Sequence, residues 1–141
     1  MNIQTKSKLV LRDLDIFLEF EEIEVGFTIT TDKEEVASLF EPGASPVKER
    51  LMALERIHKR GIRTFAFIGP LLPGNPEALA ARLEGITDKV FIDKMNYVSS
   101  IKTFYHEQGL ETAASDAFFR DYEQRLTHEL MGRKMRFEVL F

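Results

Sequence analysis

GFTITTDKEEVASLFEPGASP, residues 26–46, carries the pattern on which the predicted fold depends. Phe27 and Ile29 alternate with threonines, and β-branched residues at every second position are typical of a strand. Thr31 stands three residues before Glu34, so each side chain can accept a bond from the other's free backbone N–H in a capping box. The stretch therefore predicts a strand, a hydroxyl-rich turn and a short helix, in that order.

The segment Glu41-Pro42-Gly43 is expected to end this helix, because proline disfavours helical backbone in the preceding residue and glycine tolerates positive φ. A second helix is predicted to start directly afterwards, with Ser45 as its cap and Pro46 in its first turn. Gly61 is expected to end that helix in a left-handed conformation.

The rest of the chain continues this alternation of strands and helices. Strands are predicted over residues 2–6, 25–30, 63–68, 90–95 and 136–141. Helices are predicted over residues 7–22, 31–41, 46–60, 76–83, 98–108 and 115–131. Ser7 and Asn75 are expected to cap their helices, and Gly132 is expected to stop the last one.

This alternation predicts an α/β fold with a mostly parallel, open sheet of about four or five strands flanked by helices. A closed (β/α)₈ barrel takes ~250 residues, and a chain of 141 residues holds only part of one. We therefore expect a single domain over residues 1–141 that is either a small open sheet or a fragment of a TIM-type (β/α) barrel.

Composition excludes several classes of function. Hydrophobic residues at 44% and charged residues at 30% are typical of a soluble globular protein, and the net charge of −4 argues against binding of duplex nucleic acid by this segment alone. The absence of cysteine excludes disulfides, thiolate metal sites and a cysteine nucleophile. No apolar run approaches the ~20 residues of a membrane span, and no signal peptide is apparent. The expected location is the cytoplasm.

Polar residues gather after the predicted strands, and ligands of parallel α/β proteins bind at the carboxyl ends of strands. The four groups are Thr5, Lys6 and Ser7; Thr28, Thr30, Thr31 and Asp32; the loop from Pro70 to Gly74; and Asp93, Lys94 and Asn96. Helix capping alone accounts for Ser7 and Thr31. It does not account for Lys6 and Lys94, because a cation near a helix N-terminus opposes the helix dipole.

The histidines and Lys94 bear on two other kinds of chemistry. His58, His106 and His128 lie on predicted helices with no second ligand four residues on, so no metal site is predicted. Lys94, near a strand end, is a candidate for a Schiff base of the kind that aldolases use.

Four segments resemble the second half of a radical S-adenosylmethionine enzyme. They are TKSKLVLRDLD (residues 5–15), VGFTITTDKEEVASLFEPGASPVKERLMAL (25–54), GIRTFAFIGPLLPG (61–74) and VFIDKMNY (90–97). The branch that they resemble is that of spore photoproduct lyase, often labelled DNA repair photolyase. The resemblance covers nearly the whole chain in the family's order and implies the later portion of a partial (β/α)₆ barrel.

The resemblance also implies a binding site for S-adenosylmethionine. Lys6 is similar to the family lysine that reaches the carboxylate of the cofactor. Thr28 matches the hydroxyl position that contacts its ribose or methionine part, and Thr30 follows on the same strand. The backbone of Ile68, Gly69 and Pro70 is expected to face the adenine.

The CxxxCxxC loop that holds the family's [4Fe–4S] cluster is absent, because the chain contains no cysteine. We therefore expect the C-terminal part of a barrel that lacks the cluster-binding N-terminal part and is inactive alone. Its expected partner is the missing N-terminal half of the same enzyme. The parent protein is expected to be the enzyme.

Two alternatives stay open. One is an aldolase-like barrel fragment that uses Lys94. The other is a small α/β module for protein association without catalysis. Under either fragment hypothesis, the open sheet edges favour a homodimer.

Overall fold

The computed structural model describes residues 1–94 and 98–141, with side chains left out for residues 98–100. The strands are β1 (Asn2–Thr5), β2 (Glu24–Thr28), β3 (Arg63–Ile68), β4 (Lys89–Ile92) and β5 (Phe137–Val139). The α-helices are α1 (Leu14–Phe17), α2 (Glu34–Phe40), α3 (Val47–Lys59), α4 (Pro76–Leu83), α5 (Val98–Glu107) and α6 (Asp116–Gly132). Two 3₁₀ segments are η1 (Lys8–Asp13) and η2 (Glu111–Ala114). Met95 and Asn96, named in the sequence-based predictions, lie outside the described residues.

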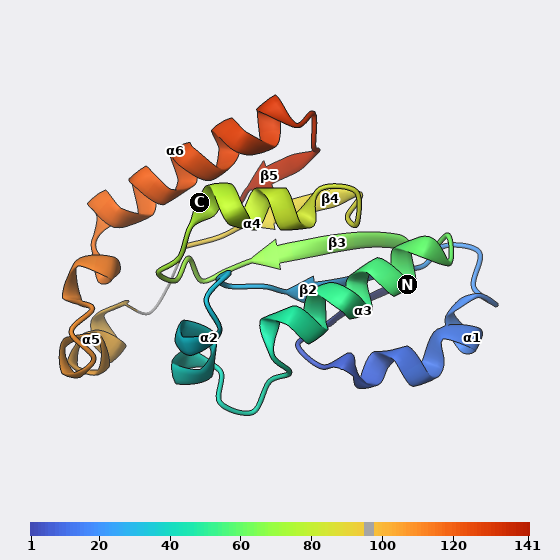
Figure 1. The fold of residues 1–141 in the computed structure, drawn as a ribbon, viewed down its shortest axis with the longest axis horizontal. Coiled ribbons are helices and arrows are strands. Elements are labelled where there is room, and N and C mark those ends of the chain that lie inside the picture. The colour runs from blue at the N-terminus through green and yellow to red at the C-terminus, as the bar shows by residue number, and fades with distance from the viewer. Residues whose placement is uncertain (95–97) are drawn as a thin grey trace.

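The five strands form one open sheet in the order β1-β2-β3-β4-β5, and every neighbouring pair is parallel. Each strand lies beside the strand that follows it in the sequence. The crossover connections between such parallel strands all have the same hand, so the connecting helices lie on one face of the sheet. Figure 1 shows α3 and α4 in front of the strands, with α6 beyond α4. The predicted fold class, an open parallel α/β sheet of partial-barrel type, is confirmed.

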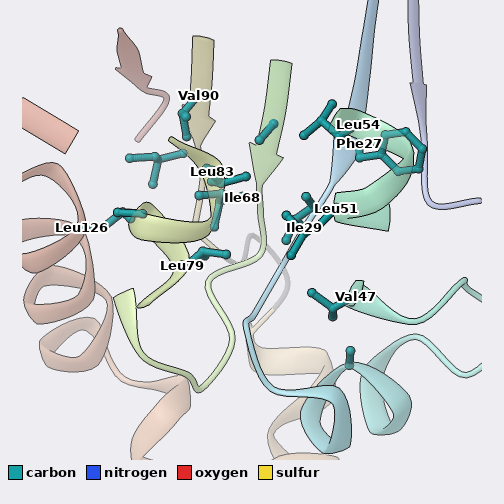
Figure 2. Close-up of a cluster of buried hydrophobic side chains, with 14 of the residues drawn as sticks. Phe27, Ile29, Val47, Leu51, Leu54, Ile68, Leu79, Leu83, Val90 and Leu126 are labelled. Atoms are coloured by element: carbon teal, nitrogen blue, oxygen red, sulfur yellow. The ribbon is translucent and has the colours of Figure 1, made fainter. Parts of the chain in front are cut away.

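The helix-covered face of the sheet holds the hydrophobic core. Phe27 of β2 and Ile29 directly after this strand are fully buried and point toward Leu51 and Leu54 of α3, as Figure 2 shows. Burying a side chain of this size contributes about 1.5–3 kcal/mol. The alternation of Phe27 and Ile29 with threonines thus gives β2 one face that packs against helices.

The opposite face of the sheet carries a different set of side chains. Gly26 pairs with Phe65 in register, and the Phe65 ring makes an edge contact with Phe91 at 5.7 Å between centroids. The amide of Gln4 donates to the hydroxyl of Thr28 at 2.9 Å on the same face. In a TIM barrel this would be the inward-facing side.

Gly26→Ala is expected to lower the free energy of unfolding by about 1–3 kcal/mol, because overpacking forces neighbours off their preferred positions. A Cβ at this position would lie 2.3 Å from the Phe65 ring, whereas one at Gly43 would meet nothing within 4 Å. Urea denaturation of both variants measures the difference. Equal stability of Gly26→Ala and the Gly43→Ala control would contradict the predicted contact.

The predicted capping box at Thr31 and Glu34 is wrong. The Thr31 hydroxyl donates to the Pro73 carbonyl at 2.6 Å, while the Glu34 carboxylate accepts from the backbone N–H groups of Val47 and Lys48 at 2.7 and 3.1 Å. Thr31 also accepts from the Lys33 N–H at 3.1 Å and so joins its own turn to the loop after β3, while Glu34 caps the neighbouring helix α3.

Three further local predictions differ from the structure. Ser45 does not cap α3; its hydroxyl accepts from the Lys8 N–H at 3.0 Å, and Pro46 is the cap residue. The helix predicted over 7–22 consists of η1 and the single turn α1; Leu11, Leu14 and Phe17, which pack at the core, are three residues apart, and such residues lie above one another in a 3₁₀ helix. Helix α6 passes through Gly132, and Lys134 takes the left-handed conformation at φ 56°.

Three other predicted helix ends are confirmed. Gly61 has a φ of +83° just beyond α3, as expected for a left-handed stop. Asn75 caps α4 by accepting from the N–H of Ala78 at 2.8 Å, and Ser7 caps η1 by accepting from Leu9. Among the described residues, none of the helices has the length and apolar character needed to cross a membrane.

Candidate functional site

A pocket of about 370 Å³ opens at the carboxyl end of the sheet, where the sequence predicted a ligand site. Three of its lining residues are polar or charged, namely Lys6, Thr30 and Glu41. The others are Leu39, Phe40, Pro70, Leu72, Ile101 and Phe104. An apolar wall beside a few convergent polar groups is the usual composition of a small-molecule site.

Lys6 follows β1 and reaches the pocket with its ammonium group. Its Nζ lies 2.8 Å from Oε2 of Glu41, and its side chain is 46% exposed while that of Glu41 is 5% exposed. The ammonium has three donors, and the ion pair with Glu41 leaves the group open to solvent on its pocket side. Lys6 is therefore the cation that an anionic ligand would meet.

Arg50 lies beneath this ion pair and is 1% exposed. Its Nη1 donates to the Thr28 carbonyl at 2.9 Å and to Oε1 of Glu41 at 3.0 Å, and its Nε donates to the Ser45 carbonyl at 2.6 Å. The Thr30 hydroxyl donates to the same Oε1 at 2.7 Å. The carboxylate of Glu41 is thus held by two cations and a hydroxyl.

Two opposing influences act on the pKa of Glu41. Burial favours the neutral acid and raises the pKa, whereas the hydrogen bonds from Lys6 and Thr30 and the charge of Arg50 lower it. The lowering influences prevail, so the pKa of Glu41 lies below its ordinary value of 4.5. The ionised carboxylate of Glu41 therefore lies between the side chains of Lys6 and Arg50, and of these two only Lys6 lines the pocket.

The other predicted cofactor-binding residues divide into two groups. Pro70 lines the pocket with Lys6 and Thr30, whereas Thr28 bonds Gln4 on the uncovered face of the sheet. The side chain of Ile68 is fully buried in the core, and its carbonyl accepts from the Asp93 N–H at 2.9 Å. Lys6, Thr30 and Pro70 are thus brought together.

Gly69 lies between β3 and β4 at this end of the sheet. A Cβ there would lie 2.7 Å from the Phe67 ring and 3.1 Å from Cβ of Asp93. Only glycine therefore fits at this position without displacing its neighbours.

The loops after β2 and β3 are joined beside the pocket. The Asp32 carboxylate accepts from the N–H of Asn75 at 2.7 Å, and Thr31 donates to Pro73. A Cβ on Gly74 would lie 2.5 Å from Oδ1 of Asp32, so only glycine fits this close approach. The hydroxyl-rich turn thus has a mainly structural role, holding the two loops in place.

Lys94 and the histidines lie apart from the pocket lining. The Nζ of Lys94 lies 5.6 Å from the ring centroid of Phe141. His58 contacts Thr64 at 3.2 Å near the amino end of β3, and His106 contacts Glu111 at 2.7 Å. Within residues 1–94 and 98–141, histidine and acidic side chains form no group with the geometry of a metal site.

Glu41 and Arg50 were missed by sequence reasoning. Glu41 was interpreted only as the residue before Pro42, and Arg50 lies between apolar positions on α3. An arginine flanked by Val47, Leu51 and Leu54 falls on the buried side of a helix, and this position was the available signal.

No family model matches the chain. An uncharacterized protein of Methanocaldococcus jannaschii is 31% identical over 140 residues, which are 98% of this chain and 49% of that protein. An uncharacterized protein of Acidianus two-tailed virus is 36% identical over 74 residues, which are 52% of this chain and 25% of that protein. The chain therefore spans about half the length of the first relative and a quarter of the second.

A solved structure of a cysteine-to-serine mutant of spore photoproduct lyase resembles the chain with a TM-score of 0.66 at 18% identity. The match covers 99% of this chain and 50% of that chain. At this level of identity the likeness establishes the fold. The chain thus has the fold of about half of a spore photoproduct lyase chain.

Proposed function

We propose that the chain is the S-adenosylmethionine-binding half of a radical S-adenosylmethionine enzyme of the spore photoproduct lyase type. The observation that carries the proposal is the position of Lys6, whose ammonium is held by Glu41 at the polar end of a pocket with apolar walls. The likeness of fold and the resemblance of sequence support the family.

The pocket has groups that suit two parts of the cofactor, its carboxylate and its base. Lys6 is the exposed donor that would bind the carboxylate of the cofactor. The apolar wall, which includes Phe40, Leu72 and Phe104, suits the uncharged base. Pro70 and the backbone beside it would form the rim near the adenine.

The residues of this chain do not fit the iron–sulfur cluster. Such clusters are held by cysteine thiolates, and the chain contains no cysteine. We propose that the thiolates come from a polypeptide segment outside these residues, equivalent to the N-terminal half of the enzyme, and that the chain alone is catalytically inactive. The contribution of this chain to the reaction would be to bind and orient the cofactor and to shield it from water.

Lys6→Ala is expected to weaken binding of S-adenosylmethionine about 10-fold to 100-fold, because a charge-assisted hydrogen bond contributes about 1.5–3 kcal/mol. Isothermal titration calorimetry measures the effect. Lys48→Ala, which removes an exposed lysine of α3, is the matched control and should bind as the wild type does. Equal affinity of the two variants, or no binding by the wild type, would contradict the proposal and favour a module for protein association.

A further inference from the structure

One face of the sheet and both of its edges are uncovered in the described residues. Helices α3, α4 and α6 lie on one side of the strands (Figure 1), and β1 and β5 each pair with one neighbour only. Parallel sheets are almost always covered on both faces, and free edge strands readily pair with another chain. The chain therefore presents a surface suited to a partner.

Large exposed apolar side chains gather at these two edges. Leu140 and Phe141 directly follow β5 and are 46% and 44% exposed. On the other edge, exposed apolar residues surround β1 and the segment that follows it, namely Met1, Leu9, Ile16, Leu18 and Phe20. Apolar groups at both edges indicate contact with a protein surface.

The amino ends of the two edges carry opposite charges. Beside the start of β1, the exposed residues Glu21 and Glu22 line a hollow of about 680 Å³ that also includes Phe20. Before β5, Lys134 and Arg136 are exposed. Because all strands point the same way, an acidic corner and a basic corner lie at the same end of the molecule.

We propose that a second copy of this chain occupies both edges and the uncovered face. With the two-fold axis parallel to the strands, β5 of each copy would pair in parallel with β1 of the other. Lys134 and Arg136 of one copy would then meet Glu21 and Glu22 of the other, twice over. The result is a closed barrel of ten parallel strands in which each copy covers the other's sheet.

An antiparallel pairing of β1 with β1 explains less. It would extend the sheet and leave the face that carries Gly26, Thr28 and Phe91 without a covering layer. It would also leave the β5 edge with its apolar residues Leu140 and Phe141 unused. The closed arrangement covers the face and both edges at once.

This inference does not depend on the proposed function, since self-association requires no cofactor. A cluster-bearing segment that docked on β1 would compete with the second copy for that edge. The dimer is therefore the expected form of the chain by itself.

Charge reversal at each edge tests the arrangement. One variant is Lys134→Glu/Arg136→Glu, and the other is Glu21→Lys/Glu22→Lys. Each variant alone places like charges together at both contacts, so its dimer dissociation constant should rise at least 10-fold over that of the wild type. An equimolar mixture restores opposite charges at both contacts and should form a one-to-one heterodimer.

Analytical ultracentrifugation without S-adenosylmethionine measures all four samples, and circular dichroism checks that each variant is folded. If a double variant is unfolded, the single changes Arg136→Glu and Glu22→Lys replace it. Lys48→Glu/Arg56→Glu, on the exposed side of α3, is the matched control and should stay dimeric. A monomeric wild type, a Lys134→Glu/Arg136→Glu variant that stays dimeric, or a mixture without heterodimers would overturn the proposal.

Discussion

Arg50→Met is expected to lower the free energy of unfolding by about 3–5 kcal/mol, the usual effect of removing one partner from a buried ion pair. The substitution leaves the Glu41 carboxylate, which is 5% exposed, without its buried counterion. It also removes the donors of the Thr28 and Ser45 carbonyls. Methionine keeps much of the arginine's apolar volume, so the effect comes mainly from lost charge and hydrogen bonds.

Denaturant unfolding of Arg50→Met and Lys8→Met provides the comparison. Lys8 forms an ion pair of 2.8 Å with Glu49, but its side chain is 52% exposed. Surface pairs contribute about 0–1 kcal/mol, so Lys8→Met should be nearly as stable as the wild type. Similar free energies of unfolding for the two variants would contradict the predicted contribution of the buried Arg50–Glu41 ion pair.

Acid is expected to destabilise the protein through Glu41. Because the pKa of Glu41 is lowered in the folded state, its ionised form contributes stability that is complete above 4.5 and is lost as the pH falls through the folded-state pKa. Protonation leaves Arg50 buried without a charged partner. The stability that is lost amounts to about 1.4 kcal/mol for each unit by which folding lowers the pKa of Glu41.

The Glu41→Gln variant isolates this contribution, because other groups also titrate; the pKa of Glu77, for example, is lowered by its hydrogen bond with Arg125. Unfolding is measured for the wild type and the variant at neutral pH and at values below 4.5. The difference in stability should be largest at neutral pH and should shrink in acid. A difference that stays constant with pH would assign the effect of the substitution to packing alone.

The fold was predictable because its signals are local and periodic. Alternation at Phe27 and Ile29 marked a strand, and the left-handed glycine at Gly61 marked the end of a helix. The repeat of strand and helix then implied parallel pairing. Errors occurred where distant segments supply the hydrogen bonds, as with Glu34, which caps α3 instead of its own helix.

The candidate site was predictable in part. Lys6, Thr30 and Pro70 could be placed together because carboxyl ends of parallel strands share one edge of a sheet. The burial of Arg50 could be predicted from its place on the apolar side of α3, but its ion pair with Glu41 could not, because that pair depends on how α2 and α3 pack. A sequence shows which residues follow strands, but it does not show which charges meet in the interior.

The junction between the loops after β2 and β3 has a consequence for ligand uptake. Asp32, Gly74 and Asn75 fix the two loops against each other, and Glu41 holds Lys6 from below. A small molecule that binds at this edge would therefore contact loops whose conformation is already fixed. Little conformational freedom of the protein would then be lost on association, and this preorganisation favours affinity.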